Sequence, residues 1–522
     1  MKPALPDARA ALLRRAAPLL RAAPFAIMPA LTALFDSRYH EFWRDEAQAV
    51  LVARDVPWPE WLVAMRMEGG PFFFHAWLRL ALTVLSPVGA LLAVGALGVL
   101  LLQLGTFRLL EAIGAGRTRS MLLSFAFSAS YIYAYELGVV IRPYAMGLGL
   151  ALLALAYLRD GLRTWQRRYV IAGTVAGSLS VLTSSHSACI AGGAFLVFGL
   201  LALTRRGGLR VGWPILASLP CFGLTLFLGL PFGPRPVVPV AESRLLQRAP
   251  QVFLSSFVPQ DWWSISWRAP HAVLDAVNLG RHWALLGIAI ALCLGLVAQL
   301  FSSPSMWRLS VFDVLAPAVG ATAVLEIVID HYWGGPRHLV FMAVPFLVII
   351  AGWGAAASPT APALRALRWC SLGALAPWLA VEVALAYWNA AADVVGSFSD
   401  TKGIAYLMPP DAHVVADAFH IDVGLLLWRP GMVTRGTDAS GAHRTYTVWD
   451  RDLRATVPPA PLVAAECAEA PDRVYYVSRG GIGWAGNHAR CFTHKWGASQ
   501  GEADFMEHFD AWQVDCACMT AK

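Results

Sequence analysis

Long apolar runs recur along most of the chain and leave it few ways to fold. Each approaches or exceeds the roughly 20 residues that a helix needs to cross about 30 Å of hydrocarbon. They lie at residues 16–35, 87–110, 119–135, 143–158, 169–184, 187–203, 211–230, 283–301, 310–329, 338–353 and 370–388. Of the 522 residues, 57% are hydrophobic and only 14% are charged, outside the usual range of soluble domains. The sequence therefore predicts an all-α polytopic membrane protein with about eleven transmembrane helices.

Clusters of arginine alternate with the apolar runs and give the orientation, because short cytoplasmic loops carry an excess of Lys and Arg. The clusters expected inside are Arg117 and Arg119; Arg159, Arg163, Arg167 and Arg168; Arg205, Arg206 and Arg210; Arg308; and Arg365 and Arg368. This pattern places the N-terminus in the cytoplasm. It also accounts for the formal net charge of +7 without nucleic acid as a partner.

The apolar segment 71–87 is expected to lie beside the membrane as a juxtamembrane helix. An odd number of crossings must separate an outer loop at 36–70 from Arg117 inside, so this segment or the next does not cross. The chain then divides into a membrane domain at 1–389, with a second outer loop at 231–282, and a soluble extracytoplasmic domain at 390–522.

The C-terminal region is predicted to be a small α/β domain. DAHVVAD and DRVYYVS are rich in strand formers and are bounded by turn residues. Its four cysteines are Cys467, Cys491, Cys516 and Cys518, an even number in a compartment that permits disulfides. One or two disulfides are expected and all three full pairings stay open, while a lone C-x-C pair has poor spacing for zinc.

Two adjacent carboxylates, Asp45 and Glu46, follow the first span on the outer side, with Glu68 further along the same loop. Asp45 and Glu46 stand at the expected start of a helix, where the positive end of the dipole favours ionised carboxylates. There they can serve as a general base or as ligands of a divalent cation. The competing interpretation is that Asp45 caps the helix.

Two further outer segments concentrate polar residues. YELGVVIRPYAM contains Glu136, Arg142 and Tyr144, and DHYWGGPRH contains His331, Arg337 and His338; His186 stands in SSHSA. An arginine beside flexible backbone at the lipid interface suits a phosphate. The alternatives are an ion pair that fixes the first turn, an interfacial anchor in the second segment, and a satisfied polar residue at a span end for His186.

These segments, in this order and on one face, resemble the GT-C superfamily of membrane glycosyltransferases. The resemblance is to bacterial proteins similar to protein O-mannosyltransferases and to the lipid A aminoarabinose transferase. The motifs that carry it are FWRDEAQAVLVA, MEGGPFFF, YELGVVIRPYAM, LTSSHS and GGPRHLVFMAVP. It implies a multi-pass protein of the bacterial inner membrane whose partners are a polyprenyl-phosphate-linked sugar donor and a glycan, lipid or protein acceptor.

The resemblance also implies roles for the residues. Asp45 is expected to be the catalytic carboxylate with Glu46 beside it, and Glu68 matches an acidic position, although Gly69 and Gly70 stand where many relatives have His-Pro or Pro-Pro. Arg337 is expected to meet the donor phosphate with His338. The remaining predicted substrate-binding residues are Arg142, Tyr144, Glu136, His186 and His331. A divalent cation held by Asp45 and Glu46 is compatible with this set, and no other cofactor is implied.

The chemistry fits single displacement, which needs a base for the acceptor hydroxyl and positive charge for the departing phosphate. It predicts inversion at the anomeric carbon. The main alternative is a transporter or flippase of a lipid-linked sugar, against which stand the gathering of charge at one face and the lack of matching halves. A third interpretation is a receptor or assembly protein that works through its C-terminal domain.

Overall fold

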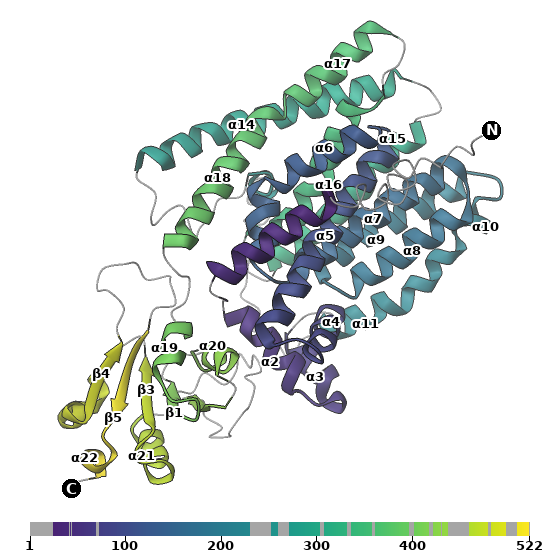
Figure 1. Ribbon diagram of the computed structural model, residues 1–522. Helices are drawn as coiled ribbons and strands as arrows, with labels where there is room; N and C mark the ends of the chain where they lie inside the picture. Colours follow the sequence, from purple (N-terminus) through teal and green to yellow (C-terminus); the bar gives the residue numbers. More distant parts are fainter. Residues whose placement is uncertain are drawn as a thin grey trace, which may run out of the picture.

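The computed structural model describes residues 24–40, 42, 44–68, 72–229, 252–258, 271–302, 307–330, 336–357, 361–395, 401–416, 421–429, 431–436, 459–478, 482–496 and 509–520. A bundle of long helices forms most of the molecule, and a small sheet with its own helices lies at one end (Figure 1). The predicted all-α membrane architecture with a small C-terminal α/β part is confirmed.

Eight helical stretches of the described chain are long and apolar enough to cross a membrane, and they cover eight of the predicted runs. They lie at Pro87–Ile113, Pro143–Thr164, Ser185–Leu203, Gly208–Leu228, Leu279–Leu300, Trp307–Glu326, His338–Ala355 and Pro362–Ala391. The helices that form them are α5 (Pro87–Ile113), α7 (Pro143–Thr164), α9 (Ser185–Leu203), α10 (Gly208–Gly212), η3 (Trp213–Ser218), α11 (Leu219–Gly229), α14 (His271–Leu300), α15 (Trp307–Asp330), α16 (Pro336–Ala355), α17 (Pro362–Gly373) and α18 (Ala376–Val395).

The other three predicted runs coincide with shorter helical pieces. The first is helical at 24–38 within the described residues, and the fifth is α8 (Arg167–Val181). The third divides into α6 (Arg117–Ser128) and the π-helix η2 (Ile132–Val139). Serine hydroxyls bond back to the chain at this break: Ser130 Oγ donates to the Phe127 carbonyl at 2.6 Å. Such side-chain bonds compete with the helical backbone ladder.

Glycines let the membrane helices approach closely. A Cβ on Gly149 of α7 would lie 2.4 Å from backbone atoms of Leu101 and Leu102 in α5, and one on Gly193 of α9 would lie 2.4 Å from the Ala316 carbonyl oxygen of α15. In a lipid environment helices associate largely through such packing of small residues. These contacts fix the positions of α7 and α9 in the bundle.

A buried ion pair joins the bundle at the end predicted to be cytoplasmic. Arg159 of α7 pairs with Asp313 of α15 through two contacts, Nε to Oδ1 at 2.7 Å and Nη2 to Oδ2 at 3.0 Å. The same guanidinium donates to the Ala112 carbonyl of α5, and Trp353 of α16 donates its indole N–H to Asp313 at 3.1 Å. Two charges removed from solvent require this degree of pairing, so four helices are joined here.

The segment 36–70, predicted as the first outer loop, contains two helices, α2 (Arg44–Asp55) and α3 (Trp61–Glu68), with the short η1 (Trp58–Glu60) between them; α4 (Phe73–Leu82) follows. The ten residues of α4 span about 15 Å, half of what a crossing needs. The apolar side chains of Trp61 and Met65 are buried against Val52, Val56 and Leu228, whereas Trp58 and Leu62 are exposed. The apolar face of this loop therefore packs partly against protein.

The C-terminal part contains a five-stranded mixed sheet in the order β2-β1-β3-β5-β4. Its strands are β1 (His413–Ala416), β2 (Val433–Gly436), β3 (Val474–Ser478), β4 (Phe492–Trp496) and β5 (Asp510–Val514). β1 runs parallel to β2 and β3, while β5 is antiparallel to β3 and β4. The helices around it are α19 (Thr401–Leu407), α20 (Ile421–Trp428), α21 (Pro459–Glu469), η5 (Gly483–Cys491) and α22 (Cys516–Thr520).

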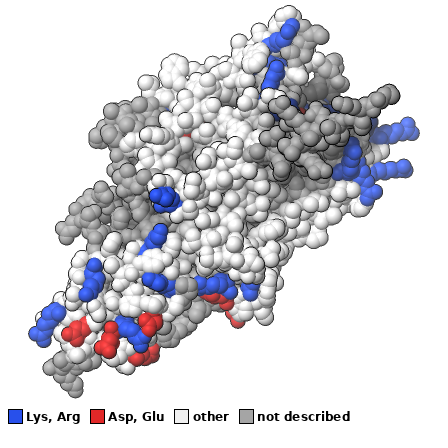
Figure 2. All heavy atoms as spheres, in the orientation of Figure 1, with Lys and Arg blue, Asp and Glu red and all other residues white. Residues whose placement is uncertain are grey.

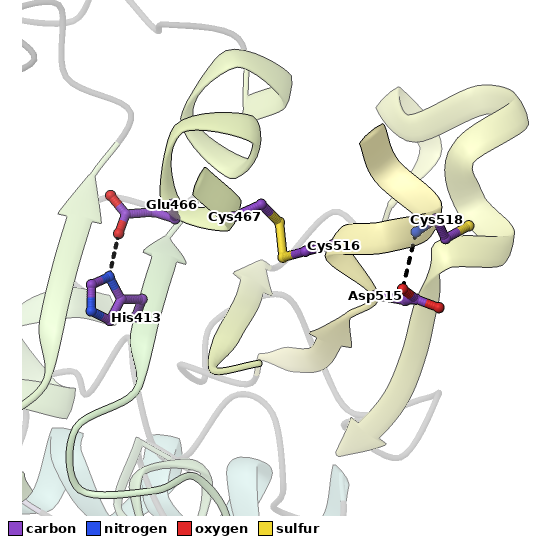
Figure 3. The surroundings of a disulfide bond; sticks show 6 residues. All are labelled: His413, Glu466, Cys467, Asp515, Cys516 and Cys518. Atoms are coloured by element: carbon purple, nitrogen blue, oxygen red, sulfur yellow. Dashed lines mark hydrogen bonds and ion pairs between the residues drawn. A yellow bond between two sulfur atoms is a disulfide. The ribbon is translucent and has the colours of Figure 1, made fainter. Parts of the chain in front are cut away.

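Two disulfides cross-link this domain and decide among the three pairings left open by the sequence. They join Cys467 to Cys516 and Cys491 to Cys518, and Figure 3 shows the first of them between α21 and α22. The four other cysteines are free: Cys189 and Cys221 are half-buried, and Cys293 and Cys370 are exposed on their helices.

The C-terminal domain packs on the first outer loop. Side chains of α2, including Val50 and Leu51, share one apolar core with Leu425 and Leu426 of α20, and α20 lies beside α2 in Figure 1. The ring of Phe42, just before α2, lies 5.9 Å from that of Trp428. Figure 2 shows a broad, nearly uncharged surface over the bundle, with Lys and Arg toward its ends and most Asp and Glu near the C-terminal domain.

Candidate active site at the helix N-termini

Three membrane helices that are far apart in the sequence begin at one place. Tyr144 stands in the first turn of α7, His186 in that of α9 and His338 in that of α16. Both α7 and α16 start with proline, at Pro143 and Pro336, a residue favoured at the first helical position. The three helices therefore begin at the points in the sequence where these polar side chains stand.

The three side chains form one cluster. The Tyr144 hydroxyl lies 2.9 Å from Nε2 of His338, and the rings of His186 and His338 stack with centroids 5.0 Å apart and planes 21° apart. The Tyr144 ring meets both imidazoles edge-on, at 5.2 Å from His338 and 6.1 Å from His186. Phe341 closes the apolar side of the cluster. All three polar residues are only half-buried, so they can be reached by a ligand.

Arg142 and His75 adjoin the cluster. Arg142 is the residue immediately before α7, and α4 is held nearby because the Phe73 N–H donates to the Leu182 carbonyl at 2.9 Å. His75 is 5% exposed, and neither of its ring nitrogens has a hydrogen-bond partner in the described part of the chain. Burial and the charge of Arg142 lower the pKa of His75 from 6.5 to about 3, so its imidazole is neutral.

Glu46 joins the first outer loop to this region. Its side chain is fully buried; Oε1 accepts the backbone N–H of Ile141 at 2.6 Å, and Oε2 lies 3.1 Å from Nε2 of His40. Ile141 directly precedes Arg142. The carboxylate therefore fixes the segment that presents Arg142, and it brings the start of α2 to the start of α7.

This arrangement is suited to an anion. The N-termini of α2, α7, α9 and α16 each contribute unpaired backbone N–H groups and the positive end of a helix dipole, which together make helix starts common phosphate sites. Arg142 adds a permanent charge, and Tyr144 and the two imidazoles add donors. A phosphate bound here would be held by charge and by directed hydrogen bonds.

Glu136, a predicted substrate-binding residue, lies on η2 beside Tyr131 and Glu382. It is buried on η2 and accepts a short hydrogen bond from the Tyr131 hydroxyl. Glu382 of α18 is fully buried next to it and accepts the Ile132 N–H at 3.0 Å. π-helices often mark functional sites, and this one contains Glu136 and accepts the contact from Glu382 of α18 shortly before Arg142 in the chain.

Several predicted site residues fall outside what the structure describes. The side chains of Asp45, Glu68 and Arg337 are outside it, although the backbone places Asp45 in the first turn of α2 and Arg337 in that of α16; His331 lies outside it entirely. Asp45 precedes Glu46, and Arg337 precedes His338. The roles of these residues, and a cation at Asp45 and Glu46, stay predictions.

The sequence analysis missed His40, His75 and Glu382. Glu382 and His75 could have been recognised from the sequence, because an ionisable residue inside an apolar segment is energetically costly and commonly marks a functional site. His40 had none, since its partner Glu46 is recognised only from the fold.

The fold and this site define a polytopic membrane protein with a cationic and aromatic cluster at one end of its helical bundle. Two solved structures share the fold. ArnT from Cupriavidus metallidurans in the apo state matches with a TM-score of 0.56 and 13% identity over 97% of this chain and 100% of that chain. The same protein bound to undecaprenyl phosphate matches with a TM-score of 0.52 and 14% identity over 97% of this chain and 99% of that chain.

This chain therefore has the fold of ArnT. No protein-family model matches its sequence, and no curated protein matches it.

Proposed function

We propose that this protein is a glycosyltransferase of the bacterial inner membrane. It moves a sugar from a polyprenyl-phosphate-linked donor to an acceptor hydroxyl at the extracytoplasmic face, with inversion at the anomeric carbon. The donor phosphate occupies the cluster formed by Tyr144, His186 and His338, with Arg142 and Arg337 supplying charge. The acceptor is a glycan, a lipid or a protein.

The observation that carries the proposal is the meeting of Tyr144, His186 and His338 at three helix N-termini. An accessible set of donors at the end of a membrane bundle suits a phosphate that is attached to a lipid tail. The undecaprenyl phosphate bound to ArnT, which has the same fold, is in keeping with this ligand class.

The reaction is a single displacement. Asp45 takes the proton of the acceptor hydroxyl as the oxygen attacks the anomeric carbon. The bond between that carbon and the phosphate oxygen breaks, and its electron pair stays on the phosphate, where Arg337, His338 and Arg142 stabilise the added charge. Glu46 holds the Arg142 segment, and Glu68 is a further proposed catalytic carboxylate. A divalent cation held by Asp45 and Glu46 would add positive charge near the phosphate.

The domain boundaries form part of this proposal. The membrane domain, residues 1–389, would bind the donor, and the extracytoplasmic domain, residues 390–522, would border the acceptor side. The packing of α20 on α2 supports that placement, because α2 is the helix that contains Asp45, the proposed base.

The test is sugar transfer by the purified protein in detergent, without a membrane gradient, from polyprenyl-phosphate-linked sugars. Asp45→Asn should lower turnover by about 10²–10⁴-fold, the usual contribution of a general base, and leave binding of polyprenyl phosphate nearly unchanged. Arg142→Gln should weaken that binding. Asp55→Asn is the matched control, because Asp55 ends the same helix and pairs with Arg54.

Unchanged turnover in Asp45→Asn would remove Asp45 from the mechanism. Absence of transfer from every such donor, together with movement of a lipid-linked sugar across vesicles that contain the protein, would favour the transporter alternative.

A further inference from the structure

Three metal-ligating side chains converge in the C-terminal domain, away from the helix N-termini. His413 is the first residue of β1, and Glu466 and Glu469 stand three apart on α21, a spacing that puts both on one helix face. One ligand atom from each lies within 4.8 Å of the other two. His413 Nδ1 is 2.5 Å from Glu466 Oε2, and Figure 3 shows the two side chains facing each other.

The donor atoms of this group suit a cation. The Glu466 side chain is 1% exposed, and buried carboxylates in proteins are commonly paired or coordinate metals.

The elements that hold the three ligands are fixed. His413 is paired on both sides in the sheet, with Val433 and Val474. Its backbone N–H also donates to the Arg473 carbonyl at 2.9 Å. Cys467, the residue after Glu466, is linked to Cys516. The two inner ligands are therefore positioned before any ion binds, while the exposed Glu469 can adjust and leaves a route from solvent.

We propose that His413, Glu466 and Glu469 bind a divalent transition-metal ion of the Zn²⁺ type. One imidazole nitrogen and two carboxylate oxygens suit such an ion, whereas Ca²⁺ and Mg²⁺ prefer oxygen ligands alone. A tetrahedral ion with bonds of about 2.0–2.2 Å needs a small inward movement of Glu469 and takes water as a fourth ligand. The proton shared by Nδ1 and Oε2 leaves to solvent as the ion enters.

The ion would join α21 to β1 and stabilise the C-terminal domain. It takes no part in the proposed sugar transfer, because its ligands belong to β1 and α21, whereas the Tyr144 cluster lies at the starts of α7, α9 and α16. This site is also distinct from the predicted cation position at Asp45 and Glu46.

The experiment measures Zn²⁺ binding to the metal-depleted, full-length protein in detergent, by calorimetry and by counting bound zinc. Glu469→Gln is the chosen variant because Glu469 is exposed and the change keeps its shape. It should lose one equivalent of Zn²⁺ or bind it at least tenfold more weakly, and Zn²⁺ should no longer raise its melting temperature. Its melting temperature without metal should equal that of the parent protein.

His494→Ala is the matched control, since His494 also pairs with a carboxylate of the same domain, Asp510, at 3.3 Å. It should keep the bound equivalent. The proposal is overturned if the parent protein binds no Zn²⁺, if Glu469→Gln binds it as the parent does, or if His494→Ala loses it equally.

Discussion

At the scale of single residues, the contacts of Glu46 decide which of two adjacent carboxylates, Asp45 or Glu46, is proposed as the general base. Glu46 is enclosed, with one oxygen on the Ile141 N–H and the other on His40. A carboxylate used in this way has little freedom to move with a reaction. The general base in the proposed mechanism is therefore assigned to Asp45, which Glu46 places by fixing the first turn of α2.

His75 makes stability depend on acid. Its pKa is about 3 in the folded protein and 6.5 ordinarily, so the unfolded chain binds the additional proton between these values. The contribution of the neutral His75 to the free energy of unfolding is complete above pH 6.5 and falls as the pH drops toward 3. At pH 5 the loss is about 2 kcal/mol. The melting temperature should fall less between pH 7 and pH 5 for His75→Gln than for the parent protein.

Gly199→Ala is the control for this measurement, because nothing lies within 4 Å of the new Cβ and neither residue titrates, so the slope with pH should stay that of the parent protein. An equal slope in the parent and in His75→Gln would show that His75 is not the acid-sensitive group.

The sequence could predict which residues gather at one end of the bundle but not how each is used there. The arginine pattern assigns Tyr144, His186 and His338 to the same side of the membrane, and in the structure the three side chains meet. The use of Glu46 could not be predicted, because its partner is a backbone N–H 95 residues away and every non-proline residue offers such a donor.

At the scale of helices, the close crossing of α5 and α7 depends on a glycine, because no side chain fits at Gly149. Gly149→Ala would force a methyl group to 2.4 Å from the backbone at Leu101 and Leu102. Overpacking of this kind costs about 1–3 kcal/mol, because backbone has to move. Thermal melting in detergent should show a clear loss of stability.

The matched control is Gly199→Ala in α9, where nothing lies within 4 Å of the new Cβ. Alanine is the better helix former by about 1 kcal/mol, so this variant should melt at the same temperature as the parent or higher. A similar loss in both variants would contradict the close crossing.

The lengths of the helices were harder to predict than their existence. Hydropathy located eight runs that the structure confirms as helices long enough to cross. It could not foresee that the run 119–135 divides at Ser128 and Ser130, because hydroxyl groups that bond to the preceding turn change the hydropathy very little.

At the scale of the whole molecule, the two disulfides should matter most for the C-terminal domain. They span 49 and 27 residues and interleave in the sequence. Replacing Cys491 and Cys518 by serine should cost about 2–5 kcal/mol, measured as a lower melting temperature of this domain. Serine at Cys293 and Cys370, which are free and exposed, is the control and should have little effect.

Peptide mass mapping without reduction checks the pairing itself. A peptide that links Cys467 to Cys518, or Cys491 to Cys516, would contradict it. The sequence could give the number of cysteines and the expectation of one or two disulfides but not the pairing, since that depends on how α22 meets α21 and η5.

The packing of α2 between the bundle and α20 sets an order of assembly. The ribosome makes α2 long before the residues that cover one of its flanks, such as Leu425 and Leu426. During synthesis that flank of α2 therefore stays uncovered until α20 has been made. A chain cut short before residue 400 would leave the flank accessible to chaperones and proteases, so quality control could detect the loss of the sheet and its helices through α2.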